Sequence, residues 1–112
     1  MSADVWIEMN ACAHCGAPDS RGAELNVTYN LSAMLREAGF KGWQAIMSEP
    51  ADKVGAHILD VLDRMAEDPE RWRSMNPQNG WGDYDRCLQG RMREWANACV
   101  SAPEGATIGG WL

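Results

Sequence analysis

Apolar and polar residues alternate along two short stretches in the first third of the chain. Residues 4–9 (DVWIEM) and 23–29 (AELNVTY) change character at every step, and a period of two is typical of a strand with one buried face. The apolar positions are Val5, Ile7 and Met9 in the first stretch and Leu25, Val27 and Tyr29 in the second. We therefore predict two strands joined by a hairpin-like connection.

Three later stretches carry apolar residues at the spacing of an α-helix. The first helix is expected between Ser32, as its N-cap, and Gly39, which suits a C-terminal position with positive φ. The second runs from about Pro50, at its first position, to Glu67, and the last from Asp83 to about Val100. The predicted buried positions are Leu31, Met34, Leu35 and Ala38, then Val54, Ile58, Val61, Leu62 and Met65, then Tyr84, Leu88, Met92, Trp95 and Cys99.

Two shorter elements complete the expected order. Asp68 and Pro69 begin a short helix, and residues 74–83 (SMNPQNGWGD) form a loop. Residues 106–112 predict a final strand with Ala106 and Ile108 facing inward. The fold class is therefore α+β, in which an N-terminal hairpin and a C-terminal strand form a small antiparallel sheet packed against three to four helices. We expect the C-terminal strand to lie beside the first.

Composition narrows the classes of partner. A chain of 112 residues predicts a single domain spanning residues 1–112. The net charge of −6 argues against direct binding to nucleic acid and favours a protein partner with a basic surface. The sequence contains no signal peptide and no apolar run long enough for a membrane span, so we expect a cytoplasmic protein. Most of the six tryptophans are expected to fill the core.

The turn Cys12-Ala-His-Cys15-Gly could supply two zinc ligands. Cys87 and Cys99 cannot both complete the site, because twelve residues of helix separate them by about 18 Å. Cys99 belongs to the buried stripe, which leaves His57, Cys87 or a second subunit as candidates. Zinc is therefore a candidate cofactor bound by Cys12, Cys15 and His57 or Cys87. A redox role is less favoured, since no helix follows the motif, and a metal-free turn is the remaining alternative.

No pattern in the sequence indicates catalysis. With two histidines there is no spacing that suggests a nucleophile and its base, and no glycine-rich loop joins a strand to a helix. The loop NGWGDY does not match the spacing of a calcium-binding loop. Its Trp81 either plugs the core or anchors a recognition loop.

Two stretches resemble a family of small uncharacterised proteins found in actinobacteria and their bacteriophages. They are NVTYNLSAM at residues 26–34 and DPERWRSMNPQNGWGDYD at residues 68–85, which is followed by a helix ending ANACVSAPEGATI. Members often carry His at the position of Tyr29. The resemblance implies that the polar and aromatic residues of these two stretches belong to one structural unit. It implies no particular activity. From this unit we name as candidate ligand- or partner-binding residues Asn26, Thr28, Asn30, Asn79, Trp81 and Tyr84. We expect Asn26 and Thr28 to hydrogen-bond the NGWG loop.

Three functions remain open at this point. The leading hypothesis is a non-enzymatic binding or regulatory protein, associated with a phage or mobile element, that docks on a host protein and could inhibit a host defence or nucleic-acid-binding protein. Its acidic helices and tryptophan-rich surface would form the contact. The second is a small-ligand or catalytic pocket at Asn26, Thr28, Asn79 and Trp81. The third is a virion or assembly component, which would form homo-oligomers.

Overall fold

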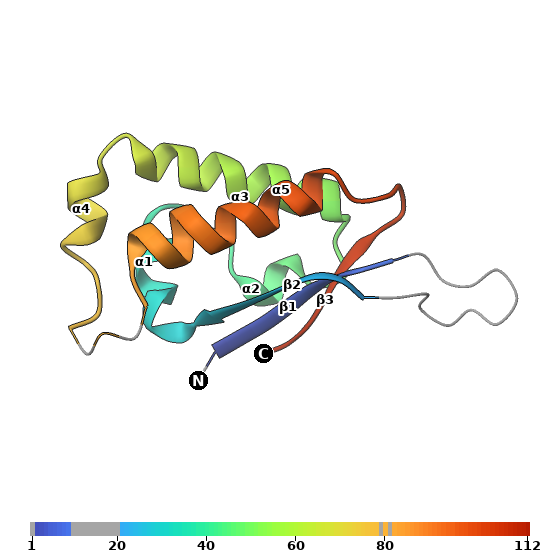
Figure 1. Ribbon diagram of the computed structural model, residues 1–112, viewed down its shortest axis with the longest axis horizontal. Helices are drawn as coiled ribbons and strands as arrows, with labels where there is room; N and C mark the ends of the chain where they lie inside the picture. Colours follow the sequence, from blue (N-terminus) through green and yellow to red (C-terminus); the bar gives the residue numbers. More distant parts are fainter. Residues whose placement is uncertain (1, 10–20, 79, 81) are drawn as a thin grey trace, which may run out of the picture.

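The computed structural model describes residues 2–9, 21–78, 80 and 82–112. Its three strands are β1 (Ser2–Glu8), β2 (Arg21–Thr28) and β3 (Thr107–Trp111). They form one antiparallel sheet in the order β2-β1-β3, so the first strand is central and the last pairs with it (Figure 1). Both the predicted hairpin and the predicted place of the C-terminal strand are confirmed.

Helices occupy most of the remaining chain. They are η1 (Tyr29–Leu31), α1 (Ser32–Glu37), α2 (Trp43–Ile46), α3 (Ala51–Ala66), α4 (Pro69–Arg73), η2 (Tyr84–Met92) and α5 (Arg93–Val100). The predicted α+β class is confirmed. The predicted last helix is a single rod in two parts, since η2 has π-helical geometry and α5 is α-helical. No helix within the described residues is long and apolar enough to span a membrane.

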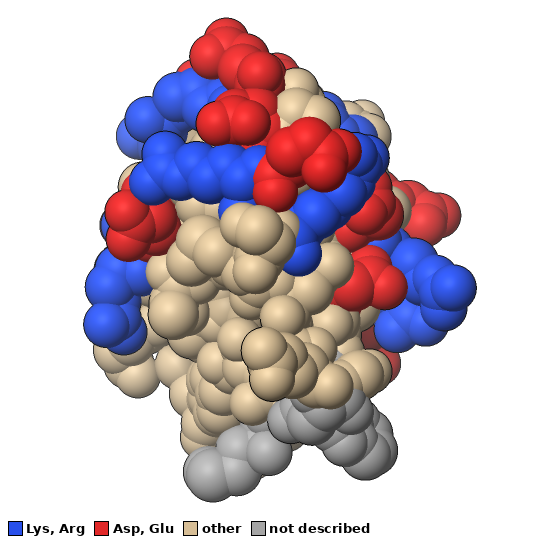
Figure 2. Space-filling view, turned by 90° about the vertical axis from the view of Figure 1, so that its left-hand side faces the viewer, with Lys and Arg blue, Asp and Glu red and all other residues tan. Residues whose placement is uncertain are grey.

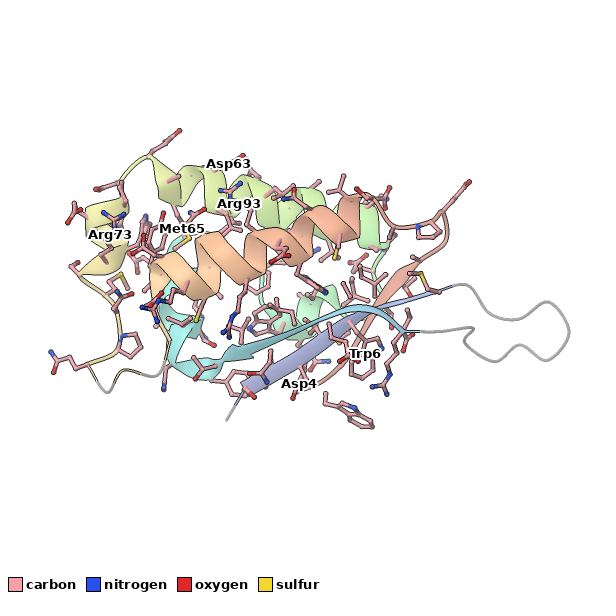
Figure 3. The ribbon with its side chains drawn as sticks, in the orientation of Figure 1. Asp4, Trp6, Asp63, Met65, Arg73 and Arg93 are labelled. Carbon is pink, nitrogen blue, oxygen red and sulfur yellow. The ribbon has the colours of Figure 1, made fainter. Side chains whose placement is uncertain are left out.

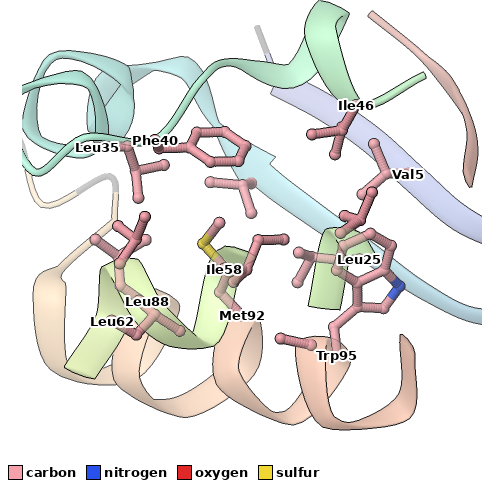
Figure 4. Close-up of a cluster of buried hydrophobic side chains, with 14 of the residues drawn as sticks. Val5, Leu25, Leu35, Phe40, Ile46, Ile58, Leu62, Leu88, Met92 and Trp95 are labelled. Atoms are coloured by element: carbon pink, nitrogen blue, oxygen red, sulfur yellow. The ribbon is translucent and has the colours of Figure 1, made fainter. Parts of the chain in front are cut away.

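The helices cover one face of the sheet. α3 and α5 lie side by side above it, and the core fills the space between the two layers (Figures 1 and 4). Val5 and Ile7 of β1, with Leu25 and Val27 of β2, point into this layer and are at most 5% exposed. The predicted stripes of the second and last helices are all buried. Burial of this apolar face is the main stabilising contribution to the fold.

Several predicted helix ends differ from the structure. Ser32 is the first residue of α1 and not its N-cap. The helical segment already begins with η1, whose N-cap is Thr28, and Oγ1 of Thr28 accepts a hydrogen bond from Asn30 N at 3.3 Å. Tyr29, expected in the second strand, therefore belongs to η1. Pro50 is the N-cap of α3 and not its first helical residue. Gly39 follows α1 with a φ of 101°, as expected.

The two acidic residues expected to start helices behave differently. The carboxylate of Asp83 accepts a hydrogen bond from Arg86 N at 2.6 Å and caps η2. Asp68 occupies the N-cap position of α4, but its side chain forms no capping bond. The same residue type thus satisfies a free helical N–H group in one case only.

We predict that Asp83→Ala lowers the free energy of unfolding by about 1 kcal/mol, because one N-terminal N–H group of η2 loses its acceptor. Asp68→Ala is the matched control and should change stability by less than about 0.5 kcal/mol. Chemical denaturation of both variants measures the difference. Equal losses in the two variants would contradict this account of the caps.

The approach of α3 to α5 depends on a glycine in the middle of a helix. A Cβ atom built on Gly55 would lie 2.6 Å from the carbonyl oxygen of Ala96 and 2.9 Å from Cβ of Cys99. Both neighbours belong to α5, and the first is backbone that cannot move aside by a rotamer change. Gly55 therefore permits the two helices to pack closely over the sheet.

We predict that Gly55→Ala destabilises the protein by about 1–3 kcal/mol, the range found for overpacked cores. Helix propensity alone predicts the opposite sign, a gain of about 1 kcal/mol. Ala56→Gly, on the exposed side of the same helix, calibrates the propensity effect. Denaturant unfolding of the two variants separates the contributions, and a stabilised Gly55→Ala protein would contradict the close packing.

Candidate docking surface on the open face of the sheet

The face of the sheet that points away from α3 and α5 carries the alternate residues of each strand. Asp4, Trp6 and Glu8 of β1 lie on this open face, as do Glu24 and Asn26 of β2. Figure 3 shows Asp4 and Trp6 on the side of the sheet away from the helices. Because successive side chains of a strand point to opposite faces, burial of Val5 and Ile7 dictates this placement.

Trp6 is buried although no helix of the described part of the chain covers it. Only 6% of it is exposed, since Trp111 packs against it with ring centroids 6.2 Å apart and the guanidinium of Arg21 lies 3.8 Å above its ring. Its indole Nε1 donates to Oε1 of Glu8 at 3.3 Å. Trp111 itself is 68% exposed, the largest exposed fraction among the described large hydrophobic residues. We call Asp4, Trp6, Glu8, Arg21 and Trp111 the open-face cluster.

A glycine on β3 makes room for this cluster. A Cβ atom on Gly109 would lie 2.6 Å from Nε1 of Trp6 and 2.5 Å from Oε1 of Glu8. Trp6 and Gly109 are directly paired across the strands. The glycine thus allows the indole to lie against the backbone of β3, while Trp111 covers it from further along the same strand.

Two hollows flank the aromatic pair. One of about 360 Å³ is lined by Asp4, Trp6, Arg21, Glu24, Asn26 and Trp111, among others. The other, of about 490 Å³, lies between Trp6, Trp111 and the Met47–Ser48 segment. An exposed tryptophan standing between two hollows is the kind of aromatic anchor that dominates protein interfaces.

The polar groups of the open face give it negative charge. The Asn26 amide donates to Oγ of Ser2 at 2.8 Å and to Oδ1 of Asp4 at 2.6 Å, which fixes the Asp4 carboxylate across the strand pair. Three carboxylates (Asp4, Glu8 and Glu24) face one guanidinium, that of Arg21. The excess charge favours a cationic group on whatever binds here.

The described residues of the unit predicted from the loop motif form separate contacts. Asn26 is on the open face, and Asn30 is an exposed residue of η1 whose N–H bonds to Thr28. The Thr28 methyl, and not its hydroxyl, meets the loop, because a Cβ on Gly82 would lie 2.7 Å from Cγ2 of Thr28. The described hydrogen bonds of the Asn26 and Thr28 side chains are formed with Ser2, Asp4 and Asn30, and their predicted bonds to the NGWG loop stay a prediction. Asn79 and Trp81 lie outside the described residues.

Tyr84 is a core residue. It is 1% exposed, its hydroxyl accepts from Nε2 of Gln89 at 2.8 Å, and its N–H donates to Oδ1 of Asn76 at 2.8 Å. Asn76 is therefore the loop side chain that holds the start of η2. The described members of the predicted unit (Asn26, Thr28, Asn30 and Tyr84) each have structural partners.

Two of the four candidate metal ligands, His57 and Cys87, lie within the described residues. Nε2 of His57 accepts from Lys41 N at 3.2 Å, and its ring stacks on Phe40, so its lone pair is already used. Cys87 belongs to η2 and is partly buried.

No group of three or more potential metal ligands occurs within the described ranges, which exclude Cys12 and Cys15. Zinc binding at the Cys12–Cys15 turn stays a prediction. Cys99 is fully buried, and burial raises the pKa of its thiol to about 12. Its predicted role as core filler is therefore consistent with a thiol that remains protonated.

Arginine side chains form ion pairs with acidic residues of the helices. Arg73 bridges Glu70 and Asp85 at 2.7 and 3.0 Å, and Arg93 pairs with Asp63 at 2.9 Å. The Arg73 guanidinium holds the pKa of Asp85 below its usual range. Figure 2 shows blue and red side chains interleaved at this end of the molecule. The acidic helices, expected as a contact surface, thus present mixed charge here.

Comparison of the chain with protein-family models, with curated proteins and with solved structures finds no match. The sequence signals for the open-face cluster were present in the alternation of β1 and in the Gly-Gly-Trp of β3. They could not be combined before the pairing of β1 with β3 was known.

Folding lowers the pKa of His57 below its ordinary value of 6.5, chiefly because burial disfavours the charged ring, with Lys41 and Arg64 adding repulsion. The unfolded chain therefore binds this proton more readily, so His57 supports stability above about pH 6.5 and this support is lost as the pH falls. We predict that His57→Gln loses less stability than wild type between pH 7.5 and 5. Between pH 7.5 and 8.5 both proteins should show the same slope, and an unchanged acid slope in the variant would contradict the assignment.

Proposed function

We propose that this chain is a non-enzymatic binding protein that docks on a partner protein through the open-face cluster. The observation that carries the proposal is Trp111, which is 68% exposed and stands on a buried tryptophan between two hollows. Aromatic residues of this kind are enriched at the centre of protein interfaces, where water is excluded. Packing on Trp6 holds the Trp111 ring before binding, which reduces the entropy lost on association.

The partner surface is basic on this proposal. The net charge of the chain is −6, and the open face presents Asp4, Glu8 and Glu24 against Arg21 alone. Arg21 on Trp6 illustrates how a cation stacks on an indole at this site. An arginine or lysine of the partner can contact the exposed face of Trp111 in the same way. Long-range attraction between the charges would also speed association at low salt.

The biological setting is proposed from the resemblance alone. Similarity to proteins of actinobacteria and their phages suggests a phage- or mobile-element-associated protein acting on a host protein inside the host cell. A nucleic-acid-binding defence protein is one candidate target, since it has the basic surface that an acidic, aromatic face can occupy.

We predict that Trp111→Ala weakens partner binding by about 30-fold or more, corresponding to about 2 kcal/mol for an aromatic anchor. Wild type, Trp111→Ala and Met75→Ala would be immobilised and exposed to lysate of an actinobacterial host. Met75 is also exposed, at 39%, but lies beyond α4, away from the cluster, and serves as the control. The captured protein is then purified for measurement of its dissociation constant with each variant.

The salt dependence of partner binding tests whether the carboxylates of the open face contribute to it. Glu8→Gln and Asp4→Asn should each weaken binding, and the effect should shrink as salt is raised toward about 1 M, where the Debye length falls to about 3 Å. Equal capture by all three immobilised proteins, or the absence of any salt-sensitive partner, would falsify the proposal. Specific oligomers of the chain alone, seen by light scattering, would instead support an assembly component.

A further inference from the structure

The outer edge of β2 carries backbone N–H and C=O groups at positions where an added strand could form hydrogen bonds. In β3, Ile108 N donates to Glu49 O at 3.1 Å and Ile108 O accepts from Ser48 N at 2.8 Å, so Ile108 directs both groups away from β1. Directions alternate along an antiparallel ladder. Ile7, which faces Ile108, and Val5 two residues before it therefore point their backbone groups toward β2.

The same alternation fixes the direction of the groups in β2. Leu25, the partner of Val5, hydrogen-bonds toward β1, and Glu24 and Asn26 on either side of it direct N–H and C=O outward. Within the described part of the chain no hydrogen bond to these outward groups is found. The edge is therefore open for two successive pairing positions. The ladder is interrupted beyond Glu24 by an extra residue in β2, which re-aims the chain there.

A groove of about 390 Å³ runs beside this edge. One side is the β2 segment 23–26, and the other is formed by Arg91, Glu94, Trp95 and Ala98. These four recur at helical spacing and so make one face of the rod formed by η2 and α5. At the bulged end, the Trp95 indole donates to the carbonyl oxygen of Ala23 at 2.9 Å and closes the edge. The arrangement is a strand edge beside a helix, which recurs in domains that bind extended peptides.

We propose that the partner contributes an extended segment that adds to β2 as a fourth strand of the sheet. The added residues on either side of the one opposite Leu25 exchange backbone hydrogen bonds with Glu24 and Asn26. The residue opposite Leu25 points its side chain toward the helix wall, near Trp95 and Ala98, where a small apolar group fits. Its two neighbours place their side chains on the open face, beside the carboxylates of Glu24 and Asp4.

The negative charge beside the edge of β2 favours a partner segment in which basic and apolar residues alternate. Glu24 is exposed and Asp4 lies opposite Asn26 in the neighbouring strand, so both carboxylates border the added strand on its open side. This charge argument rests on the proposed function, in which the partner is basic. The strand addition itself rests on the backbone geometry of β2.

A synthetic octapeptide of alternating lysine and valine is a direct probe. Amide hydrogen exchange of the ¹⁵N-labelled protein would be measured by NMR with and without this peptide. We expect exchange at the Glu24 and Asn26 amides to slow at least about tenfold, which is the change that a new hydrogen bond of about 1.4 kcal/mol produces. A peptide methylated on alternate backbone nitrogens, which lacks the donors, should leave the rates unchanged.

Two substitutions at Asn26 separate the contribution of its backbone N–H group from that of its side chain. Asn26→Pro removes an outward N–H at a strand edge, where proline is tolerated, and should abolish the effect of the peptide. Asn26→Ala keeps the N–H and should retain the effect, and thermal unfolding confirms that both are folded.

The remaining outcomes distinguish the two proposals. Unchanged exchange at Glu24 and Asn26, or equal slowing by the methylated peptide, overturns strand addition. If the peptide then still shifts the indole signals of Trp6 and Trp111, open-face docking survives. Slowing by a glutamate–valine peptide but not by the lysine peptide supports strand addition and overturns the basic partner. Slow exchange without peptide, together with a dimer by light scattering, assigns the edge to a second copy and overturns the proposal.

Discussion

The close packing of α3 on α5 sets the arrangement of the two layers of the fold. Gly55 brings the two helices together, because a side chain there would meet the backbone of Ala96. The pair then forms one layer that covers a single face of a three-stranded sheet (Figure 1). Within the described residues, no helix covers the second face of the sheet. Whatever lies on that face has to be covered by the sheet's own side chains.

The open-face cluster is the result of that constraint. Trp6 is placed outward by the alternation of β1, and Trp111 and Arg21 bury it locally, at the cost of exposing Trp111. On the helical side the carboxylates largely pair with arginines, as Arg73 and Arg93 show. Aromatic surface and unbalanced negative charge therefore coincide on the sheet. This coincidence is why docking is proposed there and not on the acidic helices.

Much of the fold could be predicted from local patterns. The strands at residues 4–9 and 23–29, the stripe of α3 and the cap at Asp83 all follow from periods and side-chain chemistry that act over a few residues. Short-range prediction was wrong at Ser32 and Pro50, because the register of a helix end depends on the chain that precedes it. The geometry of η2 and the short helix α2 were not found. No period distinguishes a π-helical turn from an α-helical one over nine residues.

The candidate sites were less predictable, because they depend on contacts between distant segments. The outward direction of Trp6 and Asn26 follows from the sequence alone, since alternation is a property of one strand. The separation of Cys87 and Cys99 along one helical rod follows from it as well. Three further facts depend on contacts between distant segments: Trp111 covers Trp6, His57 bonds to Lys41, and the Glu24–Asn26 edge beside Trp95 is unpaired within the described residues. Those facts require strand order and helix placement, which arise from burying one apolar face against another and leave no local signature.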